Sequence, residues 1–140
     1  MSSLGDRDFS LVVVTPARQV FEGDVRSLQA PGTDGDFEVL VGHIPMLTSL
    51  RPGIVTVGDV GGRSSYSVSG GFVEVMRRKA TVLAESIERV EDIDLDRACQ
   101  AETRAQQRLE SAGSSVDVAR AQAALARAQN RIKAAGIPTR

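Results

Sequence analysis

The sequence predicts a β + α architecture, with an N-terminal antiparallel β-sandwich or barrel followed by a C-terminal antiparallel two-helix hairpin. Residues 9–86 consist of short runs rich in β-branched residues, and glycine or proline separates most of them. No helix-length periodic segment interrupts this region. Residues 94–135 contain twelve alanines, one glycine and no proline, which favours helix. We therefore divide the chain into a β domain at 1–87, a linker at 88–93 and a helical hairpin at 94–140.

Eight or nine short strands are expected in the β domain. Pro16 ends the first apolar run, the Gly23-Asp24 pair predicts a turn, and Pro31-Gly32 closes another run. Their regular spacing is typical of an antiparallel sandwich and argues against a parallel α/β sheet. The expected strands cover residues 9–15, 19–22, 25–30, 37–41, 44–47, 53–58, 64–69, 72–76 and 80–85.

The hairpin is expected to contain two helices joined at Gly113-Ser114-Ser115. Asp94 and Ser114 are the predicted N-cap residues. Each helix carries a stripe with alternating spacings of three and four, in which alanine fills every second position. Burying alanine methyl groups stabilises little, so the hairpin should rest on the β domain or on a partner and be able to detach. The stripe residues are Leu95, Ala98, Glu102, Ala105, Leu109 and Ala112, then Val118, Ala121, Leu125, Ala128, Ile132 and Ala135.

Charge and composition exclude several functions. The chain has 17 basic and 18 acidic residues, a balance that argues against general nucleic-acid binding. Residues 94–140 carry 8 basic and 5 acidic groups, so the second helix and the tail through Arg140 are basic. No apolar run is long enough for a transmembrane segment, and a single cysteine fits a reducing cytosol. The pattern indicates a soluble intracellular protein.

Residues 31–53 hold the only histidine, His43, near the carboxylates of Asp34, Asp36 and Glu38. Acidic turn residues are usually solvated, and no base or metal ligand accompanies this group. Cys99 lies in the first helix far from His43, which favours a buried or half-buried structural cysteine. We therefore assign no catalytic residue and no metal ligand.

Arginines form the most suggestive set in the hairpin. Arg127 and Arg131 are four residues apart and share a helical face, and Arg97, Arg104 and Arg108 share a face of the first helix. Convergent guanidinium groups suit phosphate, whereas an ordinary solvated face has the same spacing. The spacing alone leaves both alternatives open.

Five motifs resemble, in order and spacing, the epsilon subunit of the F-type rotary ATP synthase of bacterial type. They are FEGDV at 21–25, the stretch from DGDF at 34–37 through GHIPMLT at 42–48, RPG at 51–53, SGGFVEV at 69–75 and VLAE at 82–85. The resemblance extends over about residues 9–135. Glu38 and Ile87 depart from the family pattern, which usually has a glycine and a small residue there.

The resemblance implies a non-catalytic rotor subunit of the central stalk. In the family the β domain binds the gamma subunit and the c-ring, and thereby couples proton-driven rotation to ATP synthesis. The basic second helix can extend toward the catalytic beta and alpha subunits, where it inhibits ATP hydrolysis. By this resemblance Asp34, Gly35, Asp36 and His43 form a rotor contact. The expected location is the cytoplasmic face of the bacterial inner membrane, as a peripheral part of the complex.

The resemblance also implies a nucleotide site on the folded hairpin. Some members bind ATP through a motif of the form I/L-D-x-x-R-A, which IDLDRA at 93–98 matches. The site residues carried over are Glu88, Asp94, Arg97, Ala98, Arg127 and Arg131. No cofactor is required, and ATP is the candidate regulatory ligand. Two alternatives stand beside this account: an isolated ATP-binding sensor module, and an enzyme with an acidic turn site.

Overall fold

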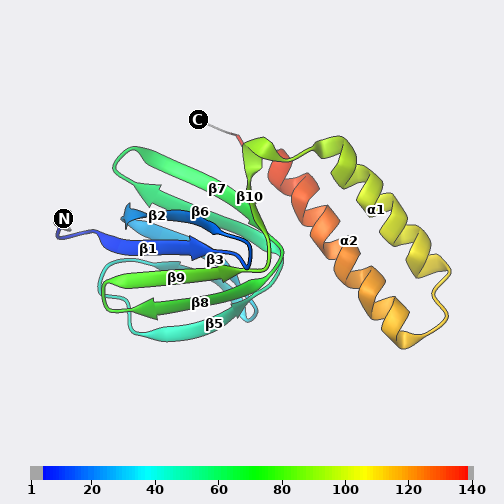
Figure 1. The fold of residues 1–140 in the computed structure, drawn as a ribbon, viewed down its shortest axis with the longest axis horizontal. Helices are drawn as coiled ribbons and strands as arrows, with labels where there is room; N and C mark the ends of the chain where they lie inside the picture. The colour runs from blue at the N-terminus through cyan, green and yellow to red at the C-terminus, as the bar shows by residue number, and fades with distance from the viewer. Residues whose placement is uncertain (1–4, 139–140) are drawn as a thin grey trace.

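A single curled β-sheet precedes a two-helix hairpin in the computed structural model, which describes residues 5–138 (Figure 1). This arrangement confirms the predicted fold class. The sheet order is β10-β7-β6-β3-β5-β8-β9-β1-β2, with β4 paired to β3. The strands are β1 (Phe9–Val14), β2 (Gln19–Val25), β3 (Ser27–Gly32), β4 (Gly35–Val39), β5 (Met46–Leu50), β6 (Gly53–Asp59), β7 (Gly62–Val68), β8 (Gly71–Met76), β9 (Lys79–Ala84) and β10 (Ile87–Arg89).

Alternating side chains fill the interior of the curled sheet. In β1, Phe9, Leu11 and Val13 are buried while the residues between them are partly exposed, as a half-buried strand requires. The sheet curls back on itself, so that its edge strand β2 contacts β6. The largest fully buried side chains are Phe9, Leu11, Leu28, Val13, Val25, Val39, Val55, Val68, Val73, Val75 and Val82.

Several sequence expectations differ from the structure in detail. β1 pairs with β9 in parallel, so the sheet is not wholly antiparallel. β2 runs through Gly23 and Asp24, where a turn was expected, because both residues pair with β1. β4 and β5 are displaced relative to the predicted 37–41 and 44–47. Part of the predicted linker belongs to the sheet, since β10 pairs with β7 before the 3-10 helix η1 (Val90–Asp92).

The glycine pair between β7 and β8 permits a sharp reversal. Gly70 and Gly71 both have φ of +139°, a region that favours glycine. A Cβ atom on Gly71 would also overlap the carbonyl oxygen of Leu83 on the neighbouring strand. The close approach of β8 to β9 therefore depends on the missing side chain.

The hairpin consists of α1 (Leu95–Glu110) and α2 (Ser115–Ala135). Both predicted caps are present: Asp94 accepts from the Arg97 amide at 3.1 Å, and Ser114 accepts from the Asp117 amide at 3.2 Å. The alanine stripe is buried at Ala98, Ala105, Ala121 and Ala128, so the helices pack closely as expected.

Three positions of the hairpin differ from expectation. Leu95 is exposed because it is the first residue of α1 and lies beyond the packed part of the stripe. At the end of α2, Ala134 is buried, whereas the stripe predicted that Ala135 would be. Cys99 is exposed, so the expectation of a buried or half-buried cysteine was wrong. It follows the buried Ala98 directly, and adjacent helical residues point in different directions. No helix within residues 5–138 is long and apolar enough to span a bilayer.

A candidate anion site between sheet and hairpin

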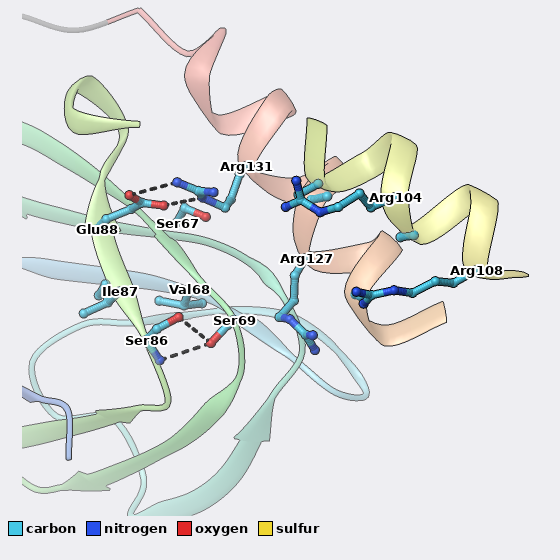
Figure 2. A pocket seen from close by; sticks show the side chains of 14 residues that line it. Ser67, Val68, Ser69, Ser86, Ile87, Glu88, Arg104, Arg108, Arg127 and Arg131 are labelled. Carbon is cyan, nitrogen blue, oxygen red and sulfur yellow. Dashed lines mark hydrogen bonds and ion pairs between the residues drawn. The ribbon is translucent and has the colours of Figure 1, made fainter. Parts of the chain in front are cut away.

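A cavity of about 440 Å³ lies between the β7–β10 edge of the sheet and the hairpin (Figure 2). Arginines line its helical side: Arg104 and Arg108 come from α1, and Arg127 and Arg131 come from α2. The i, i+4 spacing within each helix places both of its arginines on one face. The sheet side contributes Ser67, Val68, Ser69, Ser86, Ile87 and Glu88, and alanines from both helices complete the lining.

One ion pair crosses the cavity. Arg131 donates from Nε to Glu88 Oε1 at 2.5 Å, and its Nη2 lies 3.4 Å from Glu88 Oε2. Both side chains are about one-third exposed. In the described part of the chain, neither Arg104, Arg108 nor Arg127 has a carboxylate within 4.0 Å of its nitrogens. The cavity therefore carries an excess of positive charge, which favours an anionic ligand.

Two serine hydroxyls occupy the strand edge below this ion pair. The Ser86 hydroxyl donates to Ser69 Oγ at 2.8 Å, and the Ser86 amide donates to the same oxygen at 3.1 Å. Figure 2 shows both serines beneath Glu88, on the sheet side of the cavity. A hydroxyl can donate or accept, so this pair can adjust to a polar ligand.

Asn130 joins α2 to the sheet beside the cavity. Its side-chain amide donates to the Gly53 carbonyl at 2.9 Å, to Ser67 Oγ at 3.0 Å and to the Val68 carbonyl at 3.4 Å. Ser67 is a buried polar residue, so the amide provides a partner for a hydroxyl that water does not reach freely. Asn130 and Arg131 together supply the polar contacts that hold α2 on the β domain.

Three of the six residues proposed for the nucleotide site line the cavity, namely Glu88, Arg127 and Arg131. Asp94, Arg97 and Ala98 do not. Asp94 caps α1, Ala98 is fully buried, and the side chain of Arg97 is exposed away from the cavity lining. The structure thus groups the arginines of both helices and separates them from the start of the IDLDRA motif.

The proposed rotor contact is divided between the two ends of β4. Asp34 and Gly35 lie at the β3–β4 turn, next to Asp36 at the start of β4, whereas His43 follows the strand. Four residue steps from Gly35 to Val39, at about 3.3 Å per step, separate these ends. The Asp36 side chain is exposed and pairs with Arg51 Nη2 at 2.5 Å, and His43 Nδ1 lies 2.7 Å from the Ile44 carbonyl oxygen.

The strand that leads into the hairpin carries Arg89, whose surroundings favour its charged form. The Arg89 guanidinium lies 5.8 Å from the centre of the Tyr66 ring and 3.3 Å from Glu91. The electrostatic interaction with Tyr66, followed by the hydrogen bond to Glu91, raises the pKa of Arg89. Arg89 therefore stays protonated and fastens β10 to η1.

Sequence reasoning missed Asn130 and the serines at the cavity. Nothing in their spacing distinguishes them from ordinary polar residues, because their role depends on how α2 meets the ends of β6 and β7. One signal was available in the sequence: Asn130 directly precedes Arg131, a predicted site residue. Both residues are partly buried in the structure.

Family models match almost the whole chain. The model described as "ATP synthase, Delta/Epsilon chain, beta-sandwich domain" matches residues 8–90. The model described as "ATP synthase, Delta/Epsilon chain, long alpha-helix domain" matches residues 91–136. The boundary between them falls within η1.

Individual proteins agree with these matches. An ATP synthase epsilon chain of Desulfosudis oleivorans is 52% identical over 102 residues, which cover 72% of this chain and 77% of the relative. An ATP synthase epsilon chain of Pelotomaculum thermopropionicum is 47% identical over 106 residues, covering 76% and 79%.

A solved structure shares the fold. A chain of the Euglena gracilis mitochondrial ATP synthase superposes with a TM-score of 0.81 at 22% identity, covering 96% of this chain and 84% of that one. The family models and the curated relatives confirm the resemblance drawn from the short motifs. The chain belongs to the ATP synthase delta/epsilon chain family.

Proposed function

We propose that this protein is a non-catalytic central-stalk subunit of an F-type ATP synthase, in which it couples c-ring rotation to ATP synthesis through the gamma subunit. Membership of the family supports the role. It acts at the cytoplasmic face of the bacterial inner membrane as a peripheral component. The observation that carries the proposal is an exposed apolar surface on the side of the sheet facing away from its core.

This apolar face, defined by Val14, Leu47, Phe72, Met76 and Leu83, crosses four neighbouring strands. Phe72 pairs with Leu83 across β8 and β9, and Leu83 pairs with Val14 across β9 and β1. Leu47 is 69% exposed, and Phe72, Met76 and Leu83 are each about half exposed. Leu47 is paired with Glu74 and Met76 with Lys79, so charged side chains adjoin the apolar row of Phe72, Leu83 and Val14. An exposed apolar surface with a polar rim marks an interaction surface. The hairpin leaves it free, because α2 packs on β6, β7 and η1.

We assign the apolar face to the gamma subunit and the rotor contact at Asp34, Gly35, Asp36 and His43 to the c-ring and gamma. The experiment measures binding of the intact chain to its cognate gamma subunit. Phe72→Glu places a charge in the centre of the face and should weaken binding at least tenfold. Val60→Glu is the matched control, because Val60 is 79% exposed in the turn between β6 and β7. Equal binding of both variants and the native chain would remove the face from the interface.

The hairpin is the proposed regulatory element. It is held on the β domain by few polar contacts, and α2 is basic, so α2 can leave the sheet and extend toward acidic surface on the catalytic beta and alpha subunits. Deleting residues 94–140 from the assembled complex should raise ATP hydrolysis. Unchanged hydrolysis would contradict the inhibitory role and leave the coupling role intact.

ATP is the proposed regulatory ligand of the folded hairpin, and the arginine-lined cavity is its site. Glu88, Arg127 and Arg131 line the cavity, whereas Asp94, Arg97 and Ala98 lie outside its lining. Calorimetry with Mg²⁺-free ATP should show binding by the native chain and weaker binding by Arg131→Ala. Absence of binding at millimolar ATP would remove this part of the proposal, and with it the alternative of an isolated ATP sensor.

A further inference from the structure

Two loops at the end of the sheet opposite the hairpin form a tip that is both apolar and basic. Residues 40–45 connect β4 to β5, and Arg77 and Arg78 form the turn from β8 to β9, which Figure 1 shows far from the helices. The two loops are neighbours, because β5 begins at Met46, whose pairing partner Val75 lies near the end of β8. We define the basic–apolar tip by Leu40, Ile44, Arg77, Arg78 and Lys79.

The apolar part of the tip protrudes into solvent. Ile44 is 79% exposed and Leu40 is about half exposed. A turn orders the loop that carries them, because the His43 amide donates to the Leu40 carbonyl at 3.1 Å and Gly42 has φ of +82°. Single exposed apolar residues are common on proteins, so their neighbours decide what this loop can bind.

Three consecutive cations adjoin the loop. Arg77, Arg78 and Lys79 are all exposed. Arg78 donates to the carbonyl oxygens of Gly5 and Asp8 at 2.8 and 3.2 Å, which fixes the turn. In the part of the chain that the structure describes, no carboxylate lies within 4.0 Å of the side-chain nitrogens of Arg77 or Lys79. Positive charge is therefore concentrated at the tip, although the whole chain has a net charge of −1.

We infer that the basic–apolar tip contacts the headgroup region of an anionic lipid bilayer. Peripheral proteins place aliphatic side chains beside Lys and Arg at a membrane surface, because the apolar groups enter the interface while the cations attract anionic lipid. The tip consists of loop ends, so it suits a fluid surface that adapts to its shape. The inference goes beyond the proposed central-stalk function, which assigns the neighbouring His43 to subunit contacts and no residue to lipid.

The expected attraction is modest. Each basic residue near an anionic membrane strengthens binding about fivefold, so the three cations together give about a hundredfold. Stable anchoring of a free protein requires more than one such weak signal. A subunit that a complex already holds beside the membrane has a high effective concentration there, so a weak contact is sufficient. The tip is therefore expected to orient the subunit on the membrane, whereas the complex recruits it.

The test titrates the intact chain with vesicles of equal parts phosphatidylglycerol and phosphatidylcholine, and with pure phosphatidylcholine, at one low ionic strength. The chain contains no tryptophan, so Ile44→Trp introduces a single fluorescent reporter into the tip. Its emission should shift to shorter wavelength with the anionic vesicles only, and high salt should reverse the shift. Val116→Trp is the matched control, because Val116 is also exposed but lies in α2. The native chain should cosediment with the same anionic vesicles.

Paired charge substitutions in the Ile44→Trp background test the basic part of the tip. Arg77→Gln combined with Lys79→Gln should weaken binding to the anionic vesicles about twentyfold. Arg97→Gln combined with Arg120→Gln changes the net charge equally at exposed positions of the hairpin, and it should leave binding unchanged.

Three outcomes would overturn the inference. An Ile44→Trp emission that no vesicle alters would exclude the lipid contact, while the proposed central-stalk function would stand. A shift of Val116→Trp in place of Ile44→Trp would mean that the basic hairpin binds the membrane. Equal losses for the two pairs of charge substitutions would mean that only overall charge matters.

Discussion

The side-chain amide of Asn130 lies 3.0 Å from the hydroxyl oxygen of Ser67, and this hydrogen bond ties the helical hairpin to the sheet. The same amide donates to the Gly53 carbonyl at the start of β6. One residue of α2 thereby holds the ends of two strands. Because the alanine packing of the hairpin contributes little area, these polar bonds have a large influence on whether α2 stays docked.

Asn130→Ala should release α2 from the sheet. The substitution leaves the buried Ser67 hydroxyl without its partner, at a cost of about 1–3 kcal/mol. Amide hydrogen exchange in α2 should accelerate about tenfold while exchange in β8 and β9 stays unchanged, because those strands do not contact the hairpin closely. Gln129→Ala is the control, since Gln129 is exposed. Protection of α2 equal to that of the native chain would show that the bonds of Asn130 are dispensable.

The Glu88–Arg131 ion pair should contribute modestly to docking. Both groups are partly solvated, so the coupling free energy is expected to be about 0.2–1 kcal/mol. A double-mutant cycle of Glu88→Gln and Arg131→Gln, read by thermal unfolding of the intact chain, isolates this term. The coupling should shrink in high salt. A coupling energy that salt leaves unchanged would argue against an ion pair in solution.

The Asp36 carboxylate should matter for assembly more than for folding. It is exposed and pairs with Arg51, whose other terminal nitrogen still donates to the Gly32 carbonyl when the carboxylate is removed. Asp36→Ala should therefore lower the free energy of unfolding by no more than about 1 kcal/mol. The same variant should change coupling or assembly of the complex. Loss of folding would identify Asp36 as a structural turn residue instead.

Gly71 should tolerate no side chain. Its positive φ and the adjacent Leu83 carbonyl both oppose a Cβ atom, so Gly71→Ala should destabilise the β domain by at least about 2 kcal/mol in urea unfolding. Gly113 in the α1–α2 turn provides the comparison, because a Cβ atom there meets nothing within 4 Å. Gly113→Ala should change stability by no more than about 1 kcal/mol. Similar effects of the two substitutions would refute the close packing of β8 on β9.

Local patterns predicted the fold and both helix caps. Alternation of apolar residues, glycine and proline punctuation, and the alanine stripe all act over a few residues, and they specified the curled sheet and the hairpin. They failed where long-range pairing decides the outcome. Gly23 and Asp24 look like a turn but pair with β1, and Ile87 to Arg89 look like a linker but pair with β7.

The site was predictable only in part for the same reason. Helical spacing identified the pairs Arg104/Arg108 and Arg127/Arg131, since i, i+4 neighbours share a face. It also grouped Arg97 with them, whereas the structure leaves Arg97 outside the cavity. The contribution of Glu88, Ser69 and Ser86 depends on where the hairpin meets the sheet, which no local pattern encodes. Arg140, the last residue of the predicted basic tail, lies outside the described residues.

The most direct test of the central claim is ATP-driven proton pumping by the cognate ATP synthase in membrane vesicles, prepared without this subunit and then supplied with it. Our account predicts that the intact chain restores pumping in proportion to ATP hydrolysis, that Val60→Glu does so equally, and that Phe72→Glu does not. Pumping that is the same with and without the chain would contradict a role in coupling rotation to ATP synthesis.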